Sequence, residues 1–208
     1  MSKTCSIWLA VVVAIVASLW APLSQADAAE SAFATKAPRA ILMDAATGAT
    51  LFQQNADELA PPASMSKLMT LAVLFRAIKE GRINKTDEFV MSVNAWRNGG
   101  APSGTSAMMV PVNTKATVDE LIQGVAVQSG NDAAMCIAEG MAGTEAAFAR
   151  MMNDEARRIG LAKSTFANAT GLEAPNHLMT ARELAMLARY LVNEYPCLLY
   201  TSPSPRDS

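Results

Sequence analysis

The spacing of hydrophobic residues changes along the chain, and the change predicts a hairpin followed by helices. Two short apolar runs, residues 39–44 and 49–53, flank turn-forming residues 45–48 and are typical of a β-hairpin. From Leu68 onward, apolar residues recur at helical spacing, which predicts a helix over residues 64–80. The chain therefore begins its folded part with a hairpin and continues with a long helix.

Polar segments mark the helix boundaries in the second half of the chain. Thr117–Glu120 and Thr180–Glu183 each have the pattern of a capping box, and Thr144 can cap a third helix. Residues 128–131 interrupt the helix that starts at Thr117, and residues 98–104 are rich in Gly, Pro and Ser and predict a loop. The middle of the chain is therefore predicted to be a group of helices.

The N-terminal residues have the pattern of an export signal. A lysine precedes an apolar stretch at residues 7–19, and a small–x–small pattern follows at residues 26–28. An uncleaved membrane anchor is the alternative, although the stretch is short for a bilayer span. We predict a signal peptide over residues 1–28 and an exported protein.

The last residues differ in character from the rest. Residues 197–208 continue no periodic pattern, and they resemble the conceptual translation of a sequencing-library adapter. A disordered polar tail is the alternative interpretation. We interpret residues 197–208 as a non-native tail, and we expect the natural protein to continue beyond residues 29–196.

Composition and charge exclude several classes of function. The net charge is −2 and no cluster of Lys and Arg occurs, which argues against a nucleic-acid partner. The three cysteines and single histidine have no metal-ligand or disulfide spacing, so neither a metal nor a cofactor is expected. Cys136 lies in an apolar helical run and is predicted to be a buried small residue. The acidic pair Asp154 and Glu155 is predicted to lie on a solvated helix face.

The first candidate for catalytic chemistry is the pair Ser64 and Lys67. At positions i and i+3 of a helix, the two side chains reach each other, and a neighbouring base can activate a serine hydroxyl. A lysine serves as that base when burial lowers its pKa. Ser66 is the rival nucleophile, but it points elsewhere around the helix. His177 would be needed for a Ser-His-Asp mechanism, but no G-x-S-x-G elbow exists, so a structural role is expected.

The second candidate is Ser129-Gly130-Asn131, which lies in the break between two predicted helices. Gly130 permits a tight turn, so Ser129 and Asn131 can both project into a cleft. A hydroxyl there can relay a proton, and an amide can bind a peptide group. An ordinary helix cap is the alternative reading of the same residues.

Together, and in this order, the two motifs resemble those of the penicillin-recognising serine enzymes. The resemblance is closest to the D-alanyl-D-alanine carboxypeptidases, which are low-molecular-mass penicillin-binding proteins, and it runs from Ala40 to Pro196. It is also carried by the segments at residues 44–48, 62–70, 99–104, 128–133 and 171–181. The resemblance implies an α+β fold of the serine β-lactamase/D,D-peptidase type, with an antiparallel sheet and a helical subdomain, incomplete at the C-terminus.

The resemblance also implies a mechanism, partners and a location. Ser64 would attack the penultimate D-Ala carbonyl of a peptidoglycan stem peptide, and Lys67 would accept the serine proton. Ser129 would relay that proton to the leaving amine, and Asn131 would hold the substrate. β-Lactams would acylate the same serine as inhibitors. The full-length protein would be periplasmic, with peripheral association at the outer face of the cytoplasmic membrane.

One motif of the resembled family is missing. No Lys-Thr-Gly occurs in the chain, and in the family this motif lies on a strand after the helical region, where it binds the substrate carboxylate. This chain is therefore expected to lack a complete active site and to be inactive by itself. The alternatives are a serine β-lactamase, which the absence of Glu-x-x-Leu-Asn disfavours, and a non-catalytic peptidoglycan-binding scaffold.

Overall fold

The structure is a computed structural model that describes residues 34–200. The predicted signal peptide, and residues 201–208 of the predicted tail, lie outside the described residues. From Ala37 onward the described residues form one compact unit. Its elements are β1 (Ala40–Met43), β2 (Thr50–Gln54), β3 (Leu59–Ala60), the 3₁₀ turn η1 (Ala63–Ser66), α2 (Lys67–Lys79), β4 (Glu88–Val90), α3 (Val93–Gly99), the 3₁₀ turn η2 (Ala101–Ser103), β5 (Lys115–Thr117), α4 (Val118–Ala126), α5 (Asn131–Ala142), α6 (Glu145–Arg158), β6 (Met179–Thr180), α7 (Ala181–Glu194) and α8 (Pro196–Tyr200).

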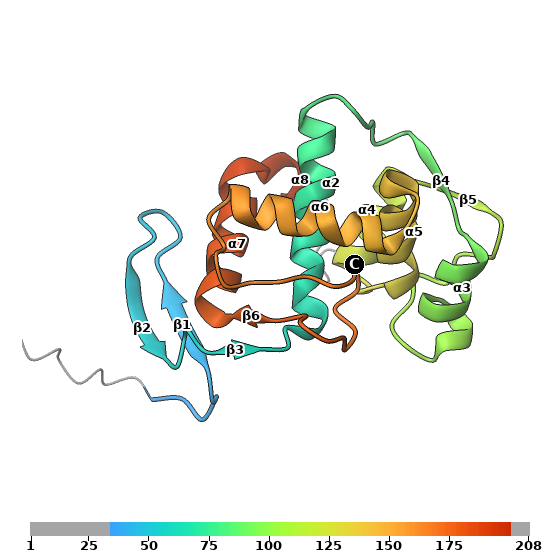
Figure 1. The fold of residues 1–208 in the computed structure, drawn as a ribbon. Helices are drawn as coiled ribbons and strands as arrows, with labels where there is room; N and C mark the ends of the chain where they lie inside the picture. The colour runs from blue at the N-terminus through green and yellow to red at the C-terminus, as the bar shows by residue number, and fades with distance from the viewer. Residues whose placement is uncertain (1–33, 201–208) are drawn as a thin grey trace, which may run out of the picture. The chain divides into compact units, whose positions relative to one another are not determined.

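The predicted hairpin is confirmed. β1 and β2 pair antiparallel, with Ala40 opposite Gln54, and lie side by side in Figure 1. The turn is closed by Asp44, whose carboxylate accepts hydrogen bonds from the backbone N–H of Thr47 at 2.7 Å and from its hydroxyl at 2.6 Å. Gly48 ends the turn at a φ of +79°, which favours glycine.

Two further ladders join segments that are far apart in the sequence. β3 pairs antiparallel with β6, and β4 pairs antiparallel with β5. With these ladders and the helices, the described part of the chain is an α+β structure, as predicted. No helix among residues 34–200 combines the length and the apolarity that a membrane span requires.

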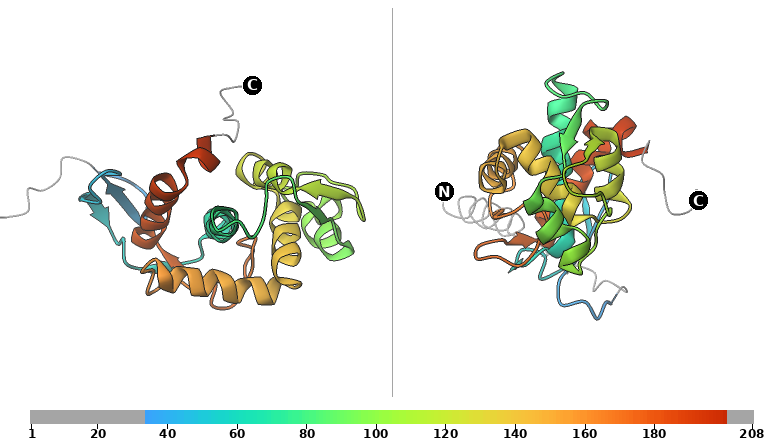
Figure 2. Two further views of the ribbon diagram at one scale, coloured as in Figure 1. Left: turned by 90° about the horizontal axis from the view of Figure 1, so that it is seen from above. Right: turned by 90° about the vertical axis from the view of Figure 1, so that its right-hand side faces the viewer.

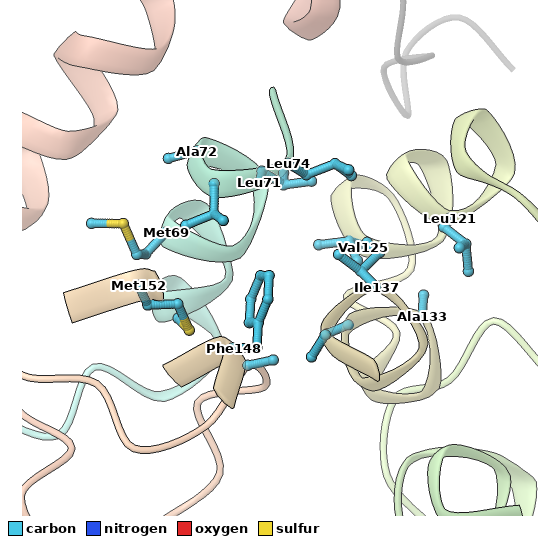
Figure 3. Packing of buried hydrophobic residues seen from close by; sticks show 14 of the residues in the cluster. Met69, Leu71, Ala72, Leu74, Leu121, Val125, Ala133, Ile137, Phe148 and Met152 are labelled. Carbon is cyan, nitrogen blue, oxygen red and sulfur yellow. The ribbon is translucent and has the colours of Figure 1, made fainter. Parts of the chain in front are cut away.

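Helix α2 lies at the centre of the hydrophobic core. It contacts α4, α5, α6 and α7, which surround it in the view along its axis (Figure 2, left). Figure 3 shows the Phe148 ring of α6 between side chains of α2 and α5. The residues of α2 that contribute are fully or almost fully buried: Met69, Leu71, Ala72, Val73, Leu74, Phe75 and Ala77. A helix buried on most sides holds its first residues in a fixed place relative to the helices around it.

The capping residues act as the sequence predicts, with one difference. Thr117 and Glu120 form a reciprocal capping box at α4, and Thr144 accepts a hydrogen bond from the N–H of Ala147 at the start of α6. Thr180 caps α7 by accepting from the N–H of Glu183, but the Glu183 carboxylate does not return to Thr180. That carboxylate is buried and accepts instead from the backbone around residue 164. The Glu183 carboxylate therefore makes a tertiary contact in place of the second hydrogen bond of the capping box.

Three predictions of local structure are wrong. Residues 98–104 are not a plain loop, because α3 extends to Gly99 behind a Ser92 cap and η2 follows. Ser64 lies in η1, one turn before the α-helix, and not at the first residue of α2. Glu155 is not solvated: its side chain is 2% exposed and is paired with Arg76 and Arg158 at 2.8 and 2.5 Å.

The start of the predicted tail lies in α8. Leu198 packs against the hydrophobic core, so residues 196–200 continue the fold for one short helix. The non-native origin of residues 197–208 stays a prediction.

Candidate active site

Ser64 and Lys67 lie at the junction of η1 and α2. The Lys67 ammonium Nζ donates a hydrogen bond to Ser64 Oγ at 3.2 Å. Ser64 is exposed, whereas Lys67 is only 3% exposed because the core closes around its stem. The predicted contact between a reachable hydroxyl and a buried amine is therefore present.

The surroundings of Lys67 favour its neutral form. Burial lowers the pKa of Lys67 from 10.5 to about 8, because the ammonium loses water and no carboxylate among residues 34–200 pairs with it. An amine with a pKa near 8 is neutral in an appreciable fraction of molecules at neutral pH. Such an amine can remove the proton of a serine hydroxyl that it already contacts.

The backbone before Ser64 adopts an unusual conformation that is held from behind. Ala63 has a φ of +50°, which is uncommon for any residue except glycine. Gly171 packs against it so closely that a Cβ on Gly171 would lie 1.9 Å from the Ala63 carbonyl oxygen. The same segment is tied to α2, because the Thr70 hydroxyl donates to the carbonyl of Ala169 at 2.7 Å. Residues 169–171 therefore support the turn that presents Ser64.

Ser129 lies in the same cavity as Ser64 and Lys67. The cavity has a volume of about 320 Å³, and its other walls are apolar: Met65, Leu68, Leu71, Val125 and Ala126. Ser129 has a φ of +54° and separates α4 from α5, as the sequence predicts for this break. The chain thus brings together three of the four predicted site residues around one apolar cavity.

Asn131 occupies a different position from the other three. It is 4% exposed at the first turn of α5 and does not line the 320 Å³ cavity. Its side-chain Nδ2 donates to the Thr105 hydroxyl at 2.9 Å, and its Oδ1 is buried without a hydrogen-bond partner among the described residues. A buried carbonyl oxygen without a donor costs free energy, so Asn131 Oδ1 is a candidate acceptor for a hydrogen bond from a ligand or another side chain.

The rival residues do not join the site. Ser66 is fully buried beneath the turn, with an unpaired hydroxyl among the described residues, and is therefore out of reach of a substrate. His177 is also buried; its Nδ1 accepts from the N–H of Ala167 at 3.3 Å, and its ring packs edge-on against Phe166. Burial lowers the pKa of His177, which favours the neutral form of the imidazole ring in this loop. The structural role predicted for His177 is confirmed.

The prediction that Cys136 is a buried small residue is also confirmed. Cys136 is fully buried, as expected of a small core residue. Within residues 34–200, no three His, Cys, Asp or Glu side chains gather as metal ligands. No sequence pattern selects Thr105, the contact of Asn131, because these residues are 26 positions apart and no local motif links them.

A larger cavity, of about 540 Å³, lies between the hairpin and α7. Its arginines are already engaged: Arg189 donates to the backbone carbonyls of Ala45 and Ala46, and Arg182 pairs with Asp57. These contacts attach the hairpin to α7. The smaller cavity is the one lined by Ser64 and Lys67, the predicted nucleophile and base.

Comparison with known proteins decides the family. A model of the family described as D-alanyl-D-alanine carboxypeptidase matches residues 25–206. The chain belongs to this family. Among its relatives, D-alanyl-D-alanine carboxypeptidase DacC of Escherichia coli is 40% identical over 157 residues, which cover 75% of this chain and 39% of that protein.

Solved structures share the fold. Penicillin binding protein 5 from Haemophilus influenzae is 34% identical, with a TM-score of 0.76 over 80% of this chain and 48% of its own. Penicillin-binding protein D2 from Listeria monocytogenes, solved in an ampicillin-bound form, is 26% identical, with a TM-score of 0.67 over 83% of this chain and 68% of its own. The predicted serine D,D-peptidase-like fold is confirmed. The chain spans about two fifths of the length of the curated relatives that it matches.

Proposed function

We propose that the protein to which this chain belongs is a serine-type D-Ala-D-Ala carboxypeptidase that acts on peptidoglycan stem peptides. The observation that carries the proposal is the hydrogen bond from the buried Lys67 amine to the exposed Ser64 hydroxyl, in a chain of this family. Such a pair performs acyl transfer without a metal or a cofactor.

Ser64 is the nucleophile and Lys67 the general base of the proposed reaction. Neutral Lys67 takes the Ser64 proton while Oγ forms a bond to the carbonyl carbon of the penultimate D-Ala. The C–N bond to the terminal D-Ala then breaks, and the proton passes to the leaving amine. Water hydrolyses the resulting ester, which returns Ser64 to its hydroxyl form. The apolar walls around Ser64 favour the neutral amine that the first step needs.

Ser129 and Asn131 are the other two residues of the proposed active site. Ser129 lines the same cavity as Lys67, so its hydroxyl is suited to relay the proton from the Lys67 ammonium to the leaving amine. Asn131 holds the substrate through its amide. β-Lactams acylate Ser64 in place of the peptide, and the ampicillin-bound relative from Listeria monocytogenes supports this part of the proposal.

Release of D-Ala from a stem pentapeptide analogue tests the proposal in the full gene product. The wild type is expected to release D-Ala, and Ser64→Ala is expected to release none. Ser66→Ala is the matched control, because it removes a buried hydroxyl that has no hydrogen-bond partner among the described residues, and it should leave the rate unchanged. Release by Ser64→Ala at the wild-type rate would sink the assignment. Rapid turnover of benzylpenicillin would favour a β-lactamase instead.

Export is part of the same proposal. Residues 1–28 have the pattern of a signal peptide, and the substrate of the proposed reaction lies outside the cytoplasm. We place the protein in the periplasm, with peripheral association at the outer face of the cytoplasmic membrane. Mass spectrometry of the N-terminus of the exported protein should find it near Ala29. A protein that remains in the cytoplasmic fraction with Met1 intact would contradict export.

A further inference from the structure

A chain of hydroxyl groups leads from Asn131 to the surface of the molecule. Asn131 Nδ2 meets Thr105 Oγ1 at 2.9 Å, and Thr105 Oγ1 meets Ser103 Oγ at 2.7 Å. Ser103 Oγ in turn contacts the carbonyl oxygen of Gly100 at 2.7 Å. Consecutive hydrogen bonds therefore join four residues, three from the segment 100–105 around η2 and one from the start of α5.

The donor and the acceptor of each hydrogen bond in this series follow from its last member, the Gly100 carbonyl. The Gly100 carbonyl can only accept, so the single proton of Ser103 points to it. The contact between the two hydroxyls then has to use the proton of Thr105. Thr105 has no second proton, so it can only accept from Asn131, and the group of Asn131 that faces it has to be the NH₂. Oδ1 is thereby turned away from Thr105.

The segment that carries Thr105 is fastened to the start of α5. The backbone N–H of Asn131 donates to the carbonyl of Ser106 at 2.8 Å. The fully buried carboxylate of Asp132 accepts from the N–H groups of Met108 and Met109 at 2.8 and 3.0 Å. Hydrogen bonds to a buried charge are strong, so Thr105 keeps its place beside Asn131 although its own side chain is exposed.

We infer that Thr105, backed by Ser103, is a positioning residue that fixes the Asn131 carboxamide with Oδ1 presented as an acceptor for an N–H donor. This inference rests on the role proposed for Asn131 in substrate binding. The unpaired, buried Oδ1 is the observation that points to a donor from outside the contacts described here. Two donors share the required chemistry: the Lys67 ammonium and a backbone N–H of the bound peptide.

A double-mutant cycle in the full gene product tests the inference. The second-order rate constant for acylation by benzylpenicillin is measured for the wild type, Thr105→Val, Asn131→Ala and the double variant. Thr105→Val keeps the β-branched shape but removes the hydroxyl, and it should lower the rate constant about tenfold. Thr105→Ser keeps the hydroxyl and should stay close to the wild type. In the Asn131→Ala background, Thr105→Val should have no further effect, since it acts through Asn131.

The pH profile of acylation separates the two donors. A shifted midpoint in Thr105→Val means that Lys67 donates to Oδ1, whereas an equal loss at every pH means that the substrate does. Thr114→Val is the matched control, because its hydroxyl donates only to the Pro111 carbonyl and its loss should not affect acylation. Thermal unfolding of each variant reports folding independently of activity.

The inference and the proposed function fail in different ways. If the wild type is acylated and Thr105→Val matches it, or if Thr105→Val costs the same factor with and without Asn131, the positioning role is wrong. If the wild type itself is not acylated at Ser64, the proposed function is wrong, and the inference falls with it.

Discussion

Replacing Lys67 by methionine should stabilise the protein at neutral pH while abolishing its activity. Lys67 is 3% exposed, and burial lowers its pKa from 10.5 to about 8. At about 1.4 kcal/mol per pH unit, this difference amounts to about 3 kcal/mol that the folded state loses when the buried amine is charged. Methionine fills the same space without a charge. It forgoes the hydrogen bond to Ser64, which contributes about 1 kcal/mol.

The sign of the effect changes with pH. Between pH 8 and 10.5 the unfolded chain binds more protons at Lys67 than the folded protein does, so the free energy of unfolding of the wild type rises with pH in this window. Below pH 8 Lys67→Met should therefore be more stable than the wild type by about 2 kcal/mol. At pH 10.5 the advantage should be gone.

Urea unfolding of the two proteins at several pH values measures this difference. Lys79→Met is the control, because Lys79 lies on the same helix but is 56% exposed, and it should show no comparable gain at neutral pH. The midpoints should be compared at equal m-values. A stability difference between Lys67→Met and the wild type that stays constant from pH 7 to 10.5 would refute the account of Lys67 as a buried base of lowered pKa.

Three further predictions concern the support of the site and the core. Glu155→Gln should lower the free energy of unfolding by about 2 kcal/mol in urea melts, whereas Asp154→Asn, at an exposed position, should change little. Burial opposes the ionisation of Glu155, but its two arginine partners outweigh burial and lower its pKa. The difference between the two variants should therefore vanish as the pH falls below this lowered pKa. Gly171→Ala should strongly reduce penicillin labelling, because the new Cβ would clash with the Ala63 carbonyl. Gly160→Ala is the control: Gly160 also has a positive φ, but nothing lies near its Cβ position. This variant should lower the free energy of unfolding by about 1 kcal/mol without loss of labelling. The pKa of the buried Cys136 thiol is raised to about 12, so peptide mapping after brief maleimide treatment should find it unlabelled in the folded protein and labelled in urea.

Local patterns allowed the hairpin and most helix starts to be predicted. The Thr117–Glu120 capping box and the turn at residues 45–48 depend on atoms within four residues of each other, so the sequence contains all the information they need. The contact of Ser64 and Lys67 is likewise a matter of helical spacing. These features form wherever the surrounding fold permits them.

Features that depend on distant partners could not be predicted. Glu155 looks like a surface acid next to Asp154. Arg158 is a local partner on the same helix, but the ion pair with Arg76 depends on the approach of α2. Ala63 carries no sign of a positive φ, which is enforced by residues that follow it by about a hundred positions. The bond between Thr105 and Asn131 depends on how residues 100–109 fold onto α5. Sequence patterns identify the chemical groups, but tertiary packing decides their orientation.

The most direct test of the central claim is the site of covalent attachment of benzylpenicillin in the full gene product. After brief incubation, proteolysis and mass spectrometry should find one peptide that has gained the mass of the whole β-lactam, with fragment ions that place the adduct on Ser64. The yield of this adduct should rise with pH as Lys67 loses its proton near pH 8. An adduct on any other residue, or none under conditions where the protein is folded, would contradict the account.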